Sequence, residues 1–227
     1  MTARRRHSAE NGFHAMRMGT KASQRATPRL YLVTPPIGNP ADIADGLADA
    51  LNATEIAAVL LRLGPGDETA QLARIKALRI LIQSNGAALI LDGHAALVAP
   101  AEADGAHLAG IDAFKAAAPA LKPARIAGCG GLATRHDAML AAESGADYVM
   151  FGEPDATGRR PSFDAVLERV AWWTEIFEVP CVAFAGNLGE VEQLARVNAE
   201  FVAVGDEIWL SARMMVDAIN LTAEPVR

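Results

Sequence analysis

The stretch "AALILDGHAALVAPAEADGAHLAGID" (87–112) contains one unit of the pattern that decides the fold. An apolar run, 87–91, leads through a short segment to a second apolar run, 105–108. Both runs are continuously hydrophobic, as expected for parallel strands that are covered on both faces. The intervening segment carries Pro100, so its helix can have only about two turns. Strand, short helix and strand together predict a parallel βαβ unit.

The same alternation extends outward from this stretch in both directions. Apolar, β-prone runs alternate with Ala/Leu/Glu-rich segments of helical spacing. The predicted strands are 30–34, 56–63, 87–91, 105–108, 125–129, 147–151, 181–185 and 201–205. The longer predicted helices are 41–52, 67–83, 162–177, 188–197 and 206–220, and Ser162 is a candidate N-cap.

Eight strands alternating with helices predict an α/β fold, a (β/α)8 TIM barrel, formed as a single domain by residues 30–222. The alternative is a doubly wound open sheet. The count of eight strands and the lack of a Gly-x-Gly-x-x-Gly motif after the first strand favour the barrel.

The first 29 residues differ in charge from the rest. They hold seven Lys/Arg and one Glu, a net charge of +6, whereas the remainder holds 14 Lys/Arg and 26 acidic residues, a net charge of −12. We expect residues 1–29 to be a disordered basic extension; an organelle transit peptide, a nucleic-acid arm and a start codon placed too early remain open. The acidic remainder argues against nucleic acid as a partner of the barrel.

Cellular setting follows from composition. No apolar run reaches the roughly 18 residues that span a bilayer, so we expect a soluble, cytoplasmic protein without membrane partners. Two cysteines, Cys129 and Cys181, fall inside apolar runs, which predicts buried thiols in a reducing compartment. The sequence leaves open whether the chain forms a homo-oligomer.

In a barrel of this type the functional residues follow the strands, at their C-terminal ends. Polar or glycine-rich segments do follow several of the predicted strands. They are Arg62, Asp92-Gly93-His94, "AGID" (109–112), Gly128–Gly131, "GEPDATGRR" (152–160), "AGN" (185–187) and "GDE" (205–207).

Four segments together resemble the thiamine phosphate synthase family and its close relatives, the thiazole tautomerases. They are "LYLVT" (30–34), "LILDGHAALVAPAEADGAHLAGID" (89–112), "GADYVMFGEPDATGRRP" (145–161) and "VAFAGN" (182–187). The resemblance runs from about Leu30 to Ile208. It implies a phosphate-binding barrel that joins an aminopyrimidine pyrophosphate to a thiazole phosphate, with Mg²⁺ holding the departing pyrophosphate.

The resemblance also implies roles for residues after the second, third and fourth strands. Of the Gln-x-Arg-x-Lys motif only Arg62 matches, because Leu60 and Gly64 replace the other two residues. The magnesium aspartate of the third strand has a counterpart in Asp92, one position early. Asp112 matches the second magnesium aspartate. We therefore expect Mg²⁺ at Asp92 and Asp112, with Arg62 on the pyrophosphate. A salt bridge from Arg62 to Asp67 or Glu68, a solvated Asp92 and a helix-capping Asp112 are the alternatives.

The later loops match the family in part. Gly130 stands where the family has a pyrophosphate-contacting serine, Thr157 matches a threonine, and Arg160 replaces a lysine. Gly186 retains one of two loop glycines, and Asp206 replaces a phosphate-binding serine. The resemblance implies substrate binding by Arg62, Asp92, Gly130, Thr157, Arg160, Gly186 and Asp206, and catalysis by Arg62 and Arg160. A solvated pair formed by Arg159 and Arg160 is the alternative for that loop.

These substitutions leave two functions open. Asp206 and Glu207 would place carboxylates at the N-terminus of the last predicted helix, where they would repel a phosphate. One function is a thiamine phosphate synthase with an altered site that acts on small phosphorylated substrates. The other is a catalytically inactive or retasked paralogue that binds another small ligand. No histidine lies near Leu132, which speaks against the tautomerase activity.

Overall fold

The computed structural model describes residues 28–205 and six later positions (208, 211, 214, 217, 218 and 220). Within them, eight parallel strands close into a barrel in which each strand pairs with its neighbours in sequence and β1 pairs with β8. The strands are β1 (Arg29–Val33), β2 (Ile56–Leu61), β3 (Ala88–Asp92), β4 (Gly105–Ala109), β5 (Ile126–Gly130), β6 (Tyr148–Phe151), β7 (Cys181–Ala185) and β8 (Phe201–Val204).

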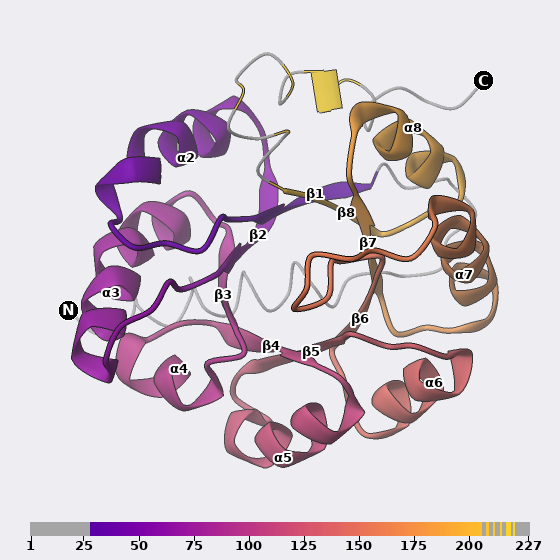
Figure 1. Cartoon of the computed structure of the whole chain (residues 1–227), viewed down its shortest axis with the longest axis horizontal. Helices are drawn as coiled ribbons and strands as arrows, with labels where there is room; N and C mark the ends of the chain where they lie inside the picture. The colour runs from indigo at the N-terminus through magenta and orange to yellow at the C-terminus, as the bar shows by residue number, and fades with distance from the viewer. Residues whose placement is uncertain are drawn as a thin grey trace.

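Helices surround the ring of strands (Figure 1). They are α2 (Ala41–Ala53), α3 (Glu68–Ser84), α4 (Ala95–Ala101), α5 (Ile111–Leu121), α6 (Arg135–Glu143), α7 (Phe163–Ile176) and α8 (Leu188–Arg196). The shortest is α4, which contains Pro100 as expected. None of the helices in the described residues is long and apolar enough to cross a membrane.

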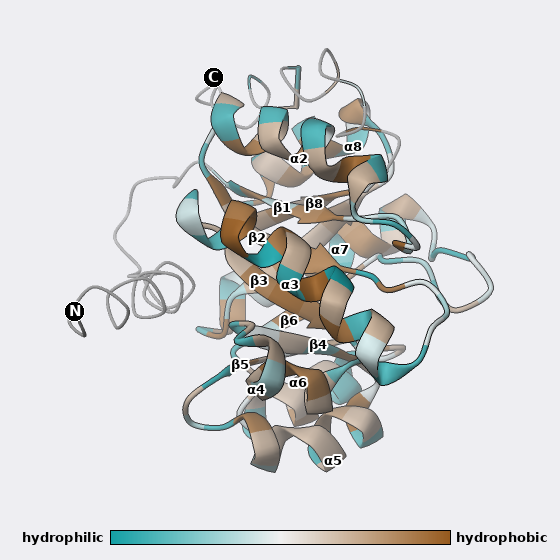
Figure 2. Cartoon of the chain, turned by 90° about the vertical axis from the view of Figure 1, so that its left-hand side faces the viewer, coloured by the Kyte–Doolittle hydropathy of each residue, from teal (hydrophilic) through white to brown (hydrophobic). Residues whose placement is uncertain are grey.

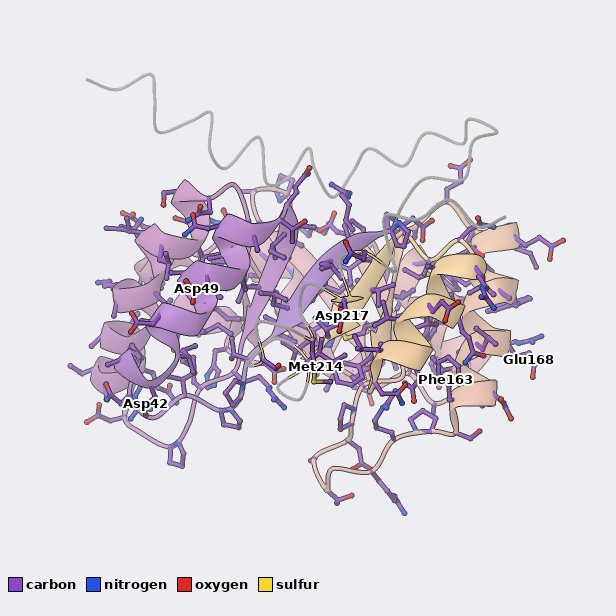
Figure 3. All side chains as sticks on the ribbon, turned by 90° about the horizontal axis from the view of Figure 1, so that it is seen from above. Asp42, Asp49, Phe163, Glu168, Met214 and Asp217 are labelled. Carbon is purple, nitrogen blue, oxygen red and sulfur yellow. The ribbon has the colours of Figure 1, made fainter. Side chains whose placement is uncertain are left out.

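Two hydrophobic layers hold the barrel together. The larger layer lies between the strands and the helices and contains fully buried residues such as Leu32, Val59 and Trp173. In Figure 2 the strands are largely brown, whereas teal residues mark the outer turns of α2 and α3. Charged side chains such as Asp42, Asp49 and Glu168 lie on the outer faces of the helices (Figure 3).

The second layer fills the barrel itself. Side chains alternate along each strand, and the inward set of β1 is Tyr31 and Val33, joined across the barrel by Tyr148, Met150 and Phe184. The interior is therefore packed with side chains, as is usual for an eight-stranded barrel. The interior side chains nearest the C-terminal ends of the strands form the floor of any binding site there.

The predicted fold is confirmed, and the closed strand order excludes the open sheet. Strand bounds differ from the prediction by at most two residues, and those of β7 agree with it. The largest difference is at β2, which ends at Leu61, because the chain turns there toward an isolated bridge between Ile37 and Leu63. Both cysteines are buried and free, as predicted. The predicted helix 206–220 and the extension before residue 28 lie outside the continuously described part of the chain.

Candidate functional site

A cavity of about 920 Å³ lies at the C-terminal ends of the strands. Its charged and titratable lining comes from five elements or the loops after them, and its apolar lining includes Val33, Leu60, Met150 and Phe184 of the barrel interior. The charged and titratable lining residues are Arg62, Asp92, His107, Glu153, Asp155, Arg159, Arg160 and Arg169. A concave site with an apolar wall and convergent polar groups is typical of small-molecule binding.

Asp92 lies on the inner face of the barrel. It ends β3, where Ala88 and Ile90 point inward, and the alternation along a strand gives Asp92 the same direction. It also lines the cavity. Asp92 comes one position earlier than the family's aspartate, yet it is partly exposed and stands where a ligand in the cavity would meet it.

Below the cavity a chain of hydrogen bonds crosses the barrel. The hydroxyls of Tyr31 and Tyr148 are 2.9 Å apart, and the Tyr148 hydroxyl lies 3.0 Å from His107 Nδ1. His107 also stacks on the Tyr148 ring, with 5.7 Å between centroids. Burial lowers the pKa of His107 to about 4 against the opposing effect of Asp92. His107 is therefore a neutral packing and hydrogen-bonding residue at pH 7.

Glu153 lies at the floor of the cavity, just after β6. Its Oε1 accepts a hydrogen bond from the Gly131 amide and lies 4.0 Å from His107 Nε2. Burial raises the pKa of Glu153 to about 7, an effect partly offset by the Gly131 bond and strengthened by the charge of Asp92. The sequence analysis included Glu153 in a polar loop but assigned it no role. Only its approach to Gly131 and His107 in space identifies it.

Gly130 makes room for that carboxyl group. A Cβ placed on Gly130 would lie 2.1 Å from Glu153 Oε1 and 2.5 Å from His107 Nε2. These distances are far shorter than van der Waals contact. Gly130 is thus buried beneath the cavity, where its lack of a side chain, rather than a polar contact, is its contribution.

Arg62 lines the cavity from the end of β2. Its backbone amide donates to Thr34 Oγ1 at 3.0 Å, and its Nε donates to the Thr34 carbonyl. Asp67, one alternative partner, caps α3 through a 2.8 Å bond from the Ala70 amide. These contacts fix Arg62 to the end of β1 and hold the guanidinium group at the mouth.

One carboxylate organises the loop after β6. Asp155 Oδ1 accepts hydrogen bonds from the Thr157 amide at 2.8 Å, the Thr157 hydroxyl at 2.6 Å and the Arg159 amide at 3.0 Å. These bonds, led by the Thr157 hydroxyl, lower the pKa of Asp155 to about 2. Thr157 therefore serves the shape of the loop, and its hydroxyl proton is directed at Asp155.

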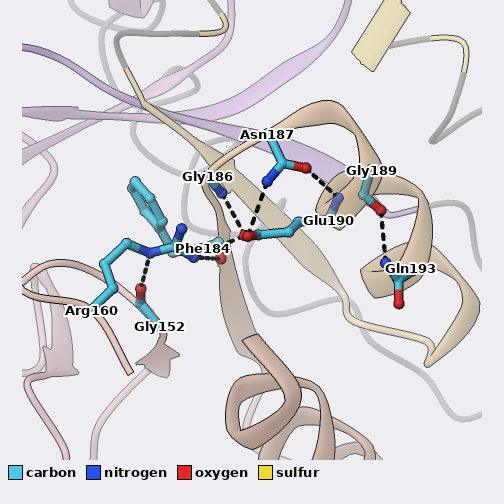
Figure 4. Close-up of polar contacts among 8 residues, drawn as sticks. All are labelled: Gly152, Arg160, Phe184, Gly186, Asn187, Gly189, Glu190 and Gln193. Atoms are coloured by element: carbon cyan, nitrogen blue, oxygen red, sulfur yellow. Dashed lines mark hydrogen bonds and ion pairs between the residues drawn. The ribbon is translucent and has the colours of Figure 1, made fainter. Parts of the chain in front are cut away.

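Arg160 is anchored where three elements meet (Figure 4). Its Nε donates to the Gly152 carbonyl at 2.9 Å, and its Nη2 donates to the Phe184 carbonyl at 3.0 Å and to Glu190 Oε2 at 2.9 Å. The guanidinium group also lies over the Phe184 ring, 4.9 Å from its centroid. The interpretation of Arg159 and Arg160 as a solvated pair is wrong for Arg160, whereas the Arg159 side chain is 84% exposed.

Glu190 accepts a hydrogen bond from the amide of Gly186, a residue for which the resemblance implies substrate binding. The Gly186 amide donates to Glu190 Oε2 at 2.7 Å, and Asn187 Nδ2 donates to Oε1 at 3.1 Å. Asn187 Oδ1 in turn caps α8 by accepting from the Glu190 amide at 3.0 Å. An internal carboxylate therefore takes the donors of Gly186 and Arg160, which the sequence assigned to substrate.

The remaining predicted site residues are not found in the cavity lining of the described structure. Asp112 is exposed in the first turn of α5, and the N-cap of that helix is Gly110. Asp206 and Glu207 lie outside the described residues. Among the residues that the structure describes, no group of three or more His, Cys, Asp or Glu side chains is arranged to hold a metal ion. Asp92 alone of the two predicted metal ligands lines the cavity.

Comparisons with known proteins agree with the barrel fold. The family model described as thiamine monophosphate synthase matches residues 30–208. The thiamine-phosphate synthase of Rhodospirillum centenum (strain ATCC 51521 / SW) is 39% identical over 184 residues, covering 80% of this chain and 89% of that protein. The thiamine-phosphate synthase of Hyphomonas neptunium (strain ATCC 15444) is 33% identical over 200 residues, 85% of this chain and 90% of that protein.

Among solved structures, the thiamine phosphate pyrophosphorylase of Pyrococcus furiosus shares the fold. It superposes with a TM-score of 0.70 at 19% identity and covers 87% of this chain and 96% of its own. Sequence and architecture thus lead to one conclusion: the chain belongs to the thiamine monophosphate synthase family, a family of thiamine biosynthesis.

Proposed function

We propose that this chain joins an aminopyrimidine pyrophosphate to a thiazole phosphate, forming thiamine phosphate and releasing pyrophosphate. The observation that carries the proposal is the position of Arg62, Asp92 and Arg160. Arg62 matches a motif arginine, Arg160 stands at a motif lysine, and Asp92 lies one position before the magnesium aspartate. All three line one cavity at the barrel mouth. The reaction breaks the bond between the pyrimidine methylene carbon and the pyrophosphate oxygen. It forms a bond from that carbon to the thiazole nitrogen.

The residues of the mouth would act mainly by electrostatics. Negative charge builds up on the departing pyrophosphate, and fixed cations facing it lower the barrier. Arg160 has a fixed orientation because backbone carbonyls at the ends of β6 and β7 accept its N–H groups. Arg62 is similarly held by Thr34. Preorganised cations of this kind need little rearrangement when the charge develops.

Magnesium fits this site through Asp92. Mg²⁺ in phosphoryl-binding sites takes one or two carboxylates and completes its shell with phosphate oxygens and water. The Asp92 carboxylate is a hard oxygen donor that lines the cavity, whereas Asp112 is exposed at the start of α5 and does not line it. When bound, Mg²⁺ would neutralise charge on the pyrophosphate.

The second candidate is a retasked barrel that binds another small ligand. It is favoured by Glu190, whose carboxylate takes the Gly186 amide and an Arg160 N–H. Under either function we propose small phosphorylated ligands, no nucleic acid, a cytoplasmic location and the option of a homo-oligomer.

A coupled assay decides between the candidates. The purified protein is mixed with both phosphorylated substrates and Mg²⁺, and thiamine phosphate is measured. We expect turnover by the unchanged chain, and a loss of roughly 100-fold or more in Arg160→Ala, because one preorganised charge contact is removed. Arg196→Ala, on the exposed side of α8, is the control. Absence of turnover, together with failure to rescue a thiamine-requiring host, would favour the retasked barrel.

A further inference from the structure

The floor of the mouth carries two acidic groups, with Arg169 of α7 near them. Asp92 from β3 and Glu153 from the end of β6 both line the cavity, and the neutral His107 lies 4.0 Å from Glu153. Arg159, which is 84% exposed, and Arg160 lie on the loop after β6. A phosphate at the floor would meet two carboxyl groups, whereas at the rim it would meet guanidinium groups. The site is thus divided by charge between floor and rim.

Glu153 is positioned by contacts at its Oε1 atom, and the residue also lines the cavity that a ligand would enter. Its Oε1 is fixed by the Gly131 amide, and its side chain is 19% exposed. The glycine at position 130 is required for this placement, because a Cβ there would overlap both Glu153 and His107. A carboxyl group that is nearly buried, oriented and facing a cavity is well suited to a specific hydrogen-bonded partner.

Because Glu153 can be protonated near neutral pH, it can donate as well as accept hydrogen bonds. Its pKa of about 7 allows the group to hold or release a proton near neutrality. A carboxylic acid donates from one oxygen and accepts at the other. The titratable and charged groups near it are Asp92 of β3, His107 of β4, Cys129 of β5, Tyr31 of β1, Tyr148 of β6 and Arg169 of α7.

The apolar lining of the same cavity suits a flat ring. Val33, Leu60, Met150 and Phe184 supply apolar surface from four different strands. A ring stacked there would present one edge to the floor and its substituent to the rim. An aminopyrimidine has a ring nitrogen beside an exocyclic amine, which is an acceptor next to a donor. That edge is complementary to a carboxylic acid in two parallel hydrogen bonds.

We propose that Glu153 recognises the aminopyrimidine by pairing with the ring nitrogen and the exocyclic amine, so that the ring lies at the floor and the pyrophosphate at the arginine-bearing rim. This assignment rests on the proposed function for the identity of the ring. Glu153 is a specificity-determining residue in this arrangement, and Asp92 remains available to the metal.

The test is calorimetric binding of the hydroxymethyl aminopyrimidine without phosphate. The unchanged protein is expected to bind it, Glu153→Gln to bind within about threefold, and Glu153→Ala at least tenfold more weakly. The amide of Gln keeps one donor and one acceptor, whereas Ala keeps neither. Glu168→Gln, on the outer face of α7, is the matched surface control. Equal affinity in Glu153→Ala, or no binding by the unchanged protein, would overturn the proposal.

Two further measurements separate ring pairing from metal binding at Glu153. The pyrimidine lacking the amino group should bind the unchanged protein at least tenfold more weakly, since a site built to hydrogen-bond a group rejects the analogue that lacks it. This comparison needs no variant to fold. If Mg²⁺ is required for binding and Glu153→Gln is as weak as Glu153→Ala, Glu153 is a metal ligand and the proposal fails.

Failure of the inference differs from failure of the proposed function. Turnover that is normal in Glu153→Ala would contradict the pairing and leave the synthase activity standing. Ring binding that depends on Glu153 without any turnover would support the pairing and favour the retasked barrel.

Discussion

At the scale of single residues, the mouth depends on a buried acid and a small neighbour. Glu153 occupies space that exists only because residue 130 has no side chain. In this position the carboxyl group is largely removed from water, and that burial is the main cause of its raised pKa.

The raised pKa of Glu153 predicts a pH-dependent difference in stability. Between the ordinary pKa of 4.5 and about 7 the folded state holds a proton that the unfolded state has lost. The free energy of unfolding contributed by this group therefore falls as pH rises through that window. Glu153→Gln has no such group, so its stability relative to the unchanged chain should increase by up to about 3 kcal/mol between pH 4 and pH 8.

Urea unfolding of both proteins at pH 4 and pH 8 measures this difference. Since His107 is present in both, its own titration largely cancels in the comparison. A difference that is the same at both pH values would mean that the pKa of Glu153 in the folded protein is not raised above its value in the unfolded chain.

At the scale of elements, side-chain carboxylates accept hydrogen bonds from backbone amides in the loops and at the start of a helix. Asp155 closes the loop after β6, and Glu190 closes the junction of β7 with α8. Each carboxylate satisfies backbone amides that would otherwise be free to bind a ligand.

Removing the Glu190 carboxylate should strengthen phosphate binding. In Glu190→Ala the Gly186 amide loses its acceptor and the Arg160 guanidinium loses its ion-pair partner. We expect inorganic phosphate to bind about tenfold more tightly, and α8 to lose stability of about 1 kcal/mol because its first turn loses a side-chain bond. Calorimetry with phosphate measures the first effect. Glu192→Ala, on the exposed side of the same helix, is the control, and unchanged affinity would refute the idea of an internal competitor.

Asp155 should control order in the loop after β6. In Asp155→Ala the amides of Thr157 and Arg159 lose their acceptor, so their hydrogen exchange should speed up at least tenfold. Asp155→Asn retains a side-chain oxygen and should protect these amides better than Ala does. Exchange rates that are equal in all three proteins would show that the loop is held by other contacts.

The elements themselves could be predicted from the sequence, but the internal contacts of the site could not. Eight apolar runs sufficed for the barrel because each strand is covered on both faces. Asp92 and Arg62 were predicted for the site because they stand at strand ends and have counterparts in the motifs of the family that the sequence resembles. Glu190 belongs to the first turn of a helix, and nothing local shows that it turns back to Gly186. Glu153 and Gly130 are 23 positions apart in sequence. Their roles at the site become visible only when the structure brings them together.

At the scale of the whole molecule, one hydrogen-bond chain connects strands across the barrel. Tyr148 of β6 lies between Tyr31 of β1 and His107 of β4. All three side chains are buried, with exposures of 3% or less. Polar groups at such depth stabilise a protein only while each has its partner.

Loss of the central hydroxyl should destabilise the barrel. Tyr148→Phe leaves two buried groups without their shared partner, and we expect the free energy of unfolding to fall by about 1–3 kcal/mol. Tyr31→Phe removes only the end of the chain and should cost less. Urea unfolding compares the two variants. A larger loss in Tyr31→Phe would place the centre of the network elsewhere.

The aromatic packing behind the mouth has a practical consequence. Two of the three tryptophans, Trp172 and Trp173, lie in α7, where Trp173 contacts Phe151 at the end of β6. The same helix supplies Arg169, which lines the cavity and donates to the Leu132 carbonyl. Indole emission is sensitive to small changes in nearby charge and packing. Intrinsic fluorescence should therefore give a label-free titration signal when a small molecule enters this barrel.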